Sequence, residues 1–176
     1  CEILDVGTGT ALIPIEFCQQ VAWGKIWGVD LAEEMLKLAR VNVENANFAD
    51  RIFPTLCDAK QLPFESDHFS LVISNSIIHH IPEPRDSFCE MIRVLQPGGF
   101  LFVRDLMRPK TADLVEELVT EYAGGETEYS RQLFRQSLHA ALTVEEVQNL
   151  LSNLELPCDS VQATSDRHWT LSVQIP

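Results

Sequence analysis

The sequence predicts an α/β domain built on a mostly parallel β-sheet with helices on both faces. An apolar run, Ile3 to Val6, leads into the glycines Gly7 and Gly9, and a second apolar run, Lys25 to Val29, follows after one helix length. Strands this apolar are typical of a sheet that is buried on both sides. Strand and helix patterns then alternate to about Asp105. This alternation favours parallel strands joined by helical crossovers.

The turn at Gly7 and Gly9 is the first candidate binding site. Glycines allow positive φ and a close approach of the backbone to a ligand, and the exposed amides of the following helix start attract a negative group. A tight turn without a ligand is the alternative. Asp30 stands 23 residues after Gly7, at the end of the second strand. There a carboxylate can accept both ribose hydroxyls of a nucleotide-like cofactor.

Asp30 also has a purely structural interpretation, as the N-cap of the helix that follows, with Glu33 as its capping-box partner. The apolar positions predicted for this helix are Met35, Leu36, Leu38, Ala39 and Val43.

The pattern Asp5-x-Gly7-x-Gly9-x-Ala11 resembles motif I of the class I S-adenosylmethionine-dependent methyltransferases, with alanine at the last glycine position. A dinucleotide fingerprint would instead need glycine at Leu12. Three further segments resemble this family in the same order, namely Cys57-Asp58-Ala59 ahead of Leu62-Pro63-Phe64, Asp67 to Asn75, and Arg93 to Gly99, taken as a turn entering a strand from Phe100 to Val103.

The resemblance implies a Rossmann-like three-layer αβα sandwich. Its seven-stranded sheet is mostly parallel, with strand order 3-2-1-4-5-7-6 and an antiparallel last strand. Alternating segments at Ser160–Thr164 and Trp169–Val173 predict the terminal hairpin. We expect one methyltransferase domain over residues 1–176, without the helices that precede the first strand in relatives and with a pocket more open to water. Residues 106–140 form the expected substrate-covering insertion.

Three helices are predicted after Pro109. They cover Ala112 to Ala123, Thr127 to Leu138, and a segment running to about Asn153 that opens with a capping box at Thr143.

The cofactor that the resemblance implies is S-adenosylmethionine. In this family the acidic residue matching Asp58 accepts from the adenine amino group, backbone groups near Ala59 pair with the ring edge, and the strand ending at Asn75 lines the methionine part. The full set of expected cofactor-binding residues is Asp5, Gly7, Thr8, Gly9, Asp30, Leu31, Asp58, Ala59 and Asn75.

A general base is needed only if the methyl acceptor must lose a proton. The candidates are His79, which we favour, and His80, just past the fourth strand. Because neighbouring side chains of a helical turn point in different directions, at most one should face the pocket. The alternative is that one ring packs beneath the loop and the other is solvated. Asp105 could meet a substrate amine or cap the chain that follows.

Four other side chains are expected to have structural roles. His168 and Trp169 lie in the predicted hairpin, where we expect them in the core and not in the site. Tyr122 and Tyr129 are expected to pack between helices, and contact with an acceptor is the alternative.

Composition limits the partners. With 26 acidic against 13 basic residues, the net charge of −13 opposes binding to nucleic acid. Five cysteines without a CxxC pair suggest neither a metal site nor disulfides, and no apolar stretch has the length of a membrane span. We expect a cytoplasmic enzyme acting on a small-molecule acceptor. The alternatives are a non-catalytic S-adenosylmethionine- or S-adenosylhomocysteine-binding protein and a nicotinamide-dependent oxidoreductase. The oligomeric state is left open.

Overall fold

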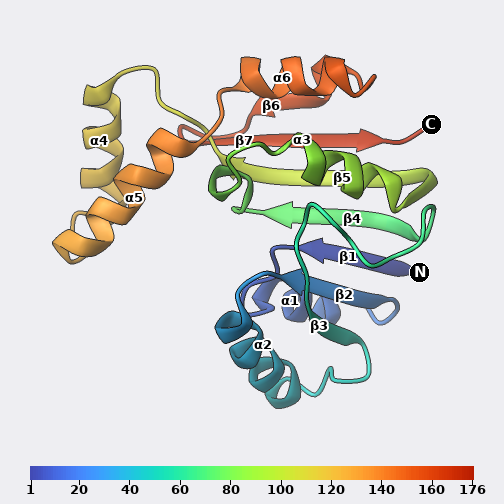
Figure 1. Cartoon of the computed structure of the whole chain (residues 1–176). Coiled ribbons are helices and arrows are strands. Elements are labelled where there is room, and N and C mark those ends of the chain that lie inside the picture. Colours follow the sequence, from blue (N-terminus) through green and yellow to red (C-terminus); the bar gives the residue numbers. More distant parts are fainter. The chain divides into compact units, whose positions relative to one another are not determined.

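The computed structural model describes residues 1–176 and contains a seven-stranded sheet in the order β3-β2-β1-β4-β5-β7-β6 (Figure 1). This is the predicted order. The strands are β1 (Glu2–Val6), β2 (Lys25–Asp30), β3 (Ile52–Leu56), β4 (Phe69–Asn75), β5 (Leu95–Leu106), β6 (Val161–Ala163) and β7 (His168–Gln174).

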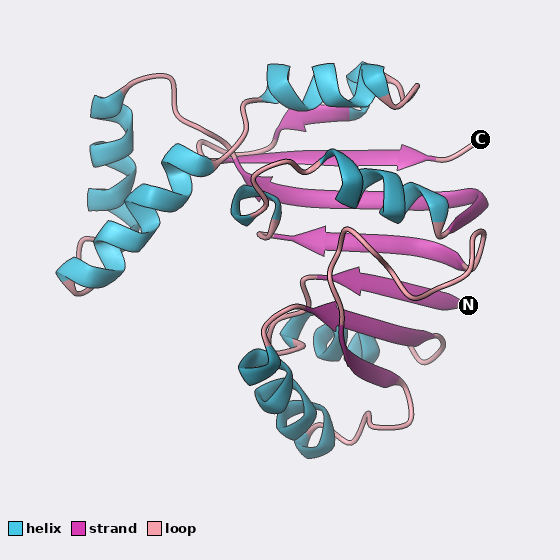
Figure 2. Ribbon diagram, viewed as in Figure 1, coloured by secondary structure: helices cyan, strands magenta, loops and turns pink.

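Six α-helices and two short 3-10 turns connect the strands (Figure 2). The helices are α1 (Leu12–Gln20), α2 (Glu33–Asn45), α3 (Arg85–Arg93), α4 (Ala112–Ala123), α5 (Glu128–Ala140) and α6 (Val144–Asn153), and the turns are η1 (Ile78–His80) and η2 (Cys158–Ser160). None of these helices has the length and apolarity needed to cross a membrane.

The chain divides into two compact units, which are described separately. The first unit comprises residues 1–75, 83–103 and 172–176, and the second comprises residues 76–82 and 104–171.

In the first unit, β1 pairs in parallel with both β2 and β4, so that Val6 lies opposite Val29 on one side and Ser74 on the other. The carboxyl ends of these three strands therefore meet at one edge of the sheet. Helices α1 and α2 share one apolar core with the strands, and α3 lies on the opposite face from α1 (Figure 1). This arrangement brings Gly7, Asp30 and Asn75 to the same edge.

In the second unit, α4 and α5 pack around an apolar cluster that includes Leu118 and Leu138. The predicted capping box is confirmed, because the Thr143 hydroxyl accepts from the Glu146 amide at 3.2 Å while the Glu146 carboxylate accepts from the Thr143 amide at 2.8 Å. The terminal hairpin is also confirmed, with β6 and β7 antiparallel. Trp169 is fully buried, as expected for a core aromatic.

Tyr122 and Tyr129 depart from the expectation of helix packing. The Tyr122 hydroxyl donates to Asp166 at 2.7 Å, and the Arg167 guanidinium lies over its ring, so this side chain contacts the hairpin turn. Tyr129 is exposed.

Three local expectations are wrong. The turn expected from Arg93 to Gly99 is wrong, because Arg93 ends α3 and β5 already starts at Leu95, where the Gly98 amide donates to the Ile175 carbonyl. Helix α2 begins at Glu33 with Ala32 as N-cap and no capping box. Of its predicted apolar positions, Met35 and Leu38 are exposed, since only one stripe of the helix meets the sheet.

Candidate functional site

The glycine turn after β1 is folded back onto β2. The amides of Gly7 and Thr8 both donate to the Val29 carbonyl, at 2.8 and 3.0 Å. Gly7 and Gly9 have φ values of 80° and 55°, which glycine adopts without a steric penalty. A Cβ added at Gly9 would meet no heavy atom within 4 Å. The turn therefore presents an open backbone surface at Gly9.

Asp30 ties the end of β2 to this turn. Its Oδ2 accepts from the Gly9 amide at 2.8 Å, and its Oδ1 accepts from the Ala32 amide at 2.9 Å. Asp30 is thus not the N-cap of α2, and the predicted capping box with Glu33 is wrong because the carboxylate binds a backbone amide 21 residues away. Each oxygen uses only one of its lone pairs in these contacts, so further donors can be accepted.

Asp5 is a buried carboxyl beneath the turn, with 2 % of its surface exposed. Its Oδ2 and the Oγ1 of Thr8 are both buried without a hydrogen-bond partner. Burial raises the pKa of Asp5 to about 7, and the nearby negative charge of Asp30 adds to the rise. The neighbouring Thr8 hydroxyl lowers this pKa in part, although its geometry falls short of a hydrogen bond. Unpartnered buried polar atoms are costly, so their presence beside an open turn indicates a ligand site.

The segment after β3 lies next to Asp30, because the Cys57 amide donates to the Asp30 carbonyl at 2.9 Å. Here Asp58 Oδ1 accepts from the Lys60 amide at 2.9 Å, which leaves Oδ2 for another donor. Leu31, 68 % exposed, offers an apolar surface directly after Asp30. The first unit thus carries all nine residues expected to bind the cofactor.

Comparison with known proteins identifies this arrangement. A family described as a methyltransferase domain matches residues 4–103, a segment that includes the glycine turn, Asp30, Asp58 and Asn75. The chain belongs to this methyltransferase family. It has the Rossmann-like fold of the class I type, and the cofactor of this family is S-adenosylmethionine.

Two curated methyltransferases are similar to this chain over part of their length. It is 31 % identical over 120 residues to the methyltransferase GfsG of Streptomyces halstedii, covering 68 % of this chain and 43 % of that protein. It is 32 % identical over 110 residues to the ubiquinone/menaquinone biosynthesis C-methyltransferase UbiE of Geobacter sulfurreducens, covering 62 % and 43 %. The chain therefore spans less than half the length of these relatives.

A solved structure confirms the fold of the methyltransferase. The plantazolicin methyltransferase BpumL, in complex with a triazolic desmethylPZN analog and SAH, matches with a TM-score of 0.79 over 99 % of this chain and 76 % of that chain. The sequence identity is 13 %, so this likeness concerns the fold alone.

The residues at the glycine turn fit S-adenosylmethionine. An open backbone surface at Gly9, a carboxylate at Asp30 with spare acceptor capacity and an unpartnered buried oxygen on Asp5 suit a ligand that carries ribose hydroxyls and positive charge.

Gly28 is a site residue to which sequence reasoning assigned no role. A Cβ at this position would lie 2.7 Å from Thr8 Oγ1 and 3.0 Å from Thr8 Cβ. Only glycine lets the turn approach β2 this closely. The available signal was a glycine inside an otherwise apolar strand, two residues before the carboxylate.

The second unit holds the candidate base. His79 Nδ1 lies 2.5 Å from Asp105 Oδ1, and the two side chains are 5 % and 1 % exposed. The amides of Ile78 and Leu106 each donate to Asp105 at 2.6 Å. Asp105 is therefore enclosed by the protein, and it caps the chain that follows it through the Leu106 amide while also accepting from the first amide of η1. The carboxylate binds Nδ1 of the His79 ring, so Nε2 is available to bind another group.

His80 is more exposed than His79, and its ring centroid lies 4.0 Å from that of His79. The two rings are therefore neighbours, contrary to the expectation that they diverge. Burial against this neighbour lowers the pKa of His80, the charge of a protonated His79 lowers it further, and Asp105 opposes both effects.

Proposed function

We propose that this methyltransferase transfers a methyl group to a small-molecule acceptor, with His79 taking the acceptor's proton. The observation that carries the proposal is the buried contact between His79 Nδ1 and Asp105 Oδ1 at 2.5 Å. A carboxylate on Nδ1 fixes the tautomer that leaves the Nε2 lone pair free, which is the form of imidazole that accepts a proton. Chain connectivity sets His79 four residues beyond Asn75, at the end of β4.

The geometry of the first unit supports the proposed cofactor contacts. Asp30 accepts the ribose hydroxyls with the lone pairs that the Gly9 and Ala32 amides leave free. Asp58 Oδ2 accepts from the adenine amino group, and Leu31 packs against the ring. Asp5 and Thr8 lie beneath the turn and favour the cationic amino acid end of the cofactor.

When bound, S-adenosylmethionine supplies an activated methyl group on a sulfonium. That carbon would bond to the acceptor's nucleophilic atom as the C–S bond breaks, and the electron pair of that bond would remain on the sulfur. The proton of the acceptor passes to His79 Nε2. The protein's main contribution is alignment, which is worth about 7–11 kcal/mol in favourable cases.

The relatives support a small acceptor. UbiE is named for ubiquinone and menaquinone biosynthesis, so a phenol or hydroquinone is a chemically reasonable first substrate class. Both give up a proton when methylated, which suits a base at His79.

Ligand selectivity tests the proposal with simple reagents. S-adenosylhomocysteine should raise the midpoint of thermal unfolding of the whole chain, because a ligand that binds only the folded state stabilises it by mass action. NAD should not, because the third glycine of its fingerprint is replaced by the exposed Leu12. In parallel, S-adenosylhomocysteine formation is followed with a panel of phenols and hydroquinones. Stabilisation by NAD alone would reject the cofactor site, and turnover only with a peptide or RNA would reject the small acceptor.

A further inference from the structure

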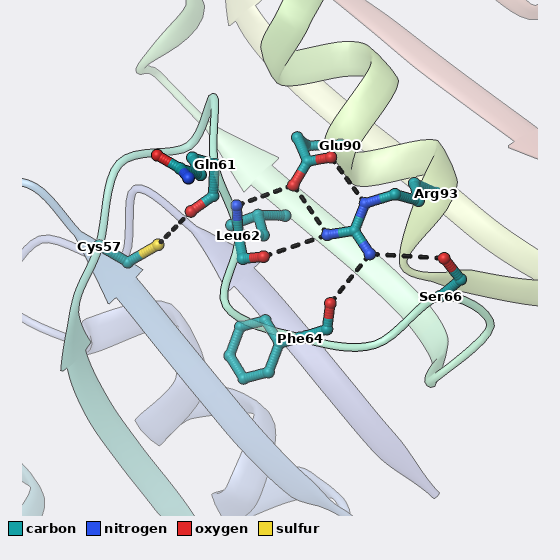
Figure 3. Close-up of polar contacts among 7 residues, drawn as sticks. All are labelled: Cys57, Gln61, Leu62, Phe64, Ser66, Glu90 and Arg93. Carbon is teal, nitrogen blue, oxygen red and sulfur yellow. Dashed lines mark hydrogen bonds and ion pairs between the residues drawn. The ribbon is translucent and has the colours of Figure 1, made fainter.

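Helix α3 reaches the segment between β3 and β4 through two charged side chains, Glu90 and Arg93 (Figure 3). Arg93 donates to Glu90 through Nε at 2.6 Å and through Nη2 at 2.8 Å. The same guanidinium donates to the carbonyl oxygens of Leu62 at 3.1 Å and Phe64 at 2.9 Å, and to Ser66 Oγ at 3.5 Å. One arginine thus binds three successive parts of the segment.

Glu90 completes the contact from the same helix. Its Oε2 accepts from the Leu62 amide at 2.8 Å while it also accepts from Arg93, and its side chain is only 19 % exposed. The hydrogen bonds from Arg93 lower the pKa of Glu90, so the carboxylate stays charged. Leu62 is therefore held by its amide through Glu90 and by its carbonyl through Arg93. The planar fork of Arg93, which lysine does not provide, binds the two oxygens of Glu90 at the same time.

The other end of the same turn is fixed by Cys57. Its thiol donates to the carbonyl of Asp58 at 3.2 Å and approaches that of Gln61 at 3.5 Å, and its amide is bound to the Asp30 carbonyl. Figure 3 shows Cys57 and Glu90 on opposite sides of the turn. The residues between these anchors are Asp58, Ala59, Lys60 and Gln61, which include both positions proposed to read the adenine ring.

We infer that Glu90 and Arg93 are positioning residues for adenine recognition. They set the conformation of the turn from Asp58 to Leu62 and so place the Asp58 carboxylate and the Ala59 backbone against the ring. The inference rests on the proposed role of Asp58. Neither Glu90 nor Arg93 touches the cofactor, and each acts through the turn that it holds.

The test compares two ligands that differ at the group Asp58 would bind. In S-inosylhomocysteine a carbonyl oxygen replaces the adenine amino group, so this position of the ring accepts hydrogen bonds and no longer donates to a carboxylate. Wild-type protein should therefore prefer S-adenosylhomocysteine in calorimetric titrations. Arg93→Lys keeps the charge but loses the fork, and it should reduce this preference by roughly tenfold, a size typical of coupling between interacting residues. Glu90→Gln, which keeps the shape and an acceptor oxygen, provides a second variant should the first not fold.

A matched control is available in the second unit. Arg135 also binds a glutamate through two nitrogens, at 2.6 and 2.9 Å to Glu116. Arg135→Lys removes the same kind of fork and should leave the ligand preference unchanged.

The Asp58→Ala variant distinguishes two claims, namely that Asp58 binds the adenine amino group and that Glu90 and Arg93 position Asp58 for this contact. If Asp58 reads the amino group, this variant loses the preference by itself, and adding Arg93→Lys has no further effect on it. An unchanged preference in Asp58→Ala would refute the adenine contact. A preference lost in Asp58→Ala but kept in both Arg93→Lys and Glu90→Gln would overturn the positioning role alone.

Discussion

His79→Ala is expected to lower methyl transfer by about 10²–10⁴-fold, the usual contribution of a positioned general base. The physical reason is the loss of the nitrogen that accepts the acceptor's proton, while the glycine turn and Asp30 are untouched. The affinity for S-adenosylhomocysteine should therefore stay within twofold of wild type. The measurement is single-turnover formation of S-adenosylhomocysteine with the phenol or hydroquinone that reacts fastest, together with a calorimetric titration.

His80→Ala is the matched control, since it removes the neighbouring ring without breaking the contact between His79 and Asp105. It should reduce turnover far less. Equal turnover in wild type and His79→Ala would mean that alignment alone carries the reaction.

Asp5→Asn is expected to stabilise the ligand-free protein at alkaline pH. Burial raises the pKa of Asp5 to about 7 in the folded state, against 3.8 for an unperturbed group. Between these two values the folded protein keeps a proton that the unfolded chain releases, so the free energy of unfolding falls as the pH rises through this window. At about 1.36 kcal/mol per pKa unit, the full loss above pH 7 is roughly 4 kcal/mol.

The measurement is urea unfolding of wild type and Asp5→Asn at several pH values between 4 and 8. The buried amide of the asparagine adds a contribution of its own, which does not depend on pH. The informative quantity is therefore the free energy of unfolding of Asp5→Asn minus that of wild type at each pH. This difference should increase by several kcal/mol as the pH rises. A difference that stays constant would show that Asp5 is not perturbed by burial.

The same substitution should weaken binding of S-adenosylhomocysteine, because a charged carboxylate beneath the turn favours the ligand's ammonium group. Asp5 would thus lower the stability of the ligand-free protein while it strengthens cofactor binding, a combination that is common at functional sites.

The elements that could be predicted from the sequence carry local signals. β1, β2 and the turn between Gly7 and Gly9 follow from short apolar runs and glycine spacing, and α4 and α6 follow from their breaks and caps. Helix α3 was not predicted. It has nine residues, and its only buried apolar side chains are Phe88 and Met91, which are too few to establish a helical period.

The missed details of the site depend on contacts between distant residues. Asp30 has a good N-cap side chain, but the Gly9 amide across the turn binds it, so the helix starts later. The partner of His79 is Asp105, which lies 26 residues away at the end of β5. The sequence pattern predicts a turn at Arg93, whereas this residue ends α3 and its side chain binds the segment before β4. No local pattern encodes such pairings, because they depend on which strands become neighbours in the sheet.

The most direct test of the proposed cofactor site is calorimetric titration of S-adenosylhomocysteine into wild type and Asp30→Ala. If Asp30 accepts the ribose hydroxyls, the substitution should weaken binding by about 1.5–3 kcal/mol per lost charge-assisted hydrogen bond, which is at least tenfold in affinity. Asp50→Ala, at an exposed acidic residue outside the proposed site, is the control and should bind like wild type. Unchanged affinity for S-adenosylhomocysteine in a folded Asp30→Ala variant would contradict the proposal that Asp30 binds the cofactor's ribose.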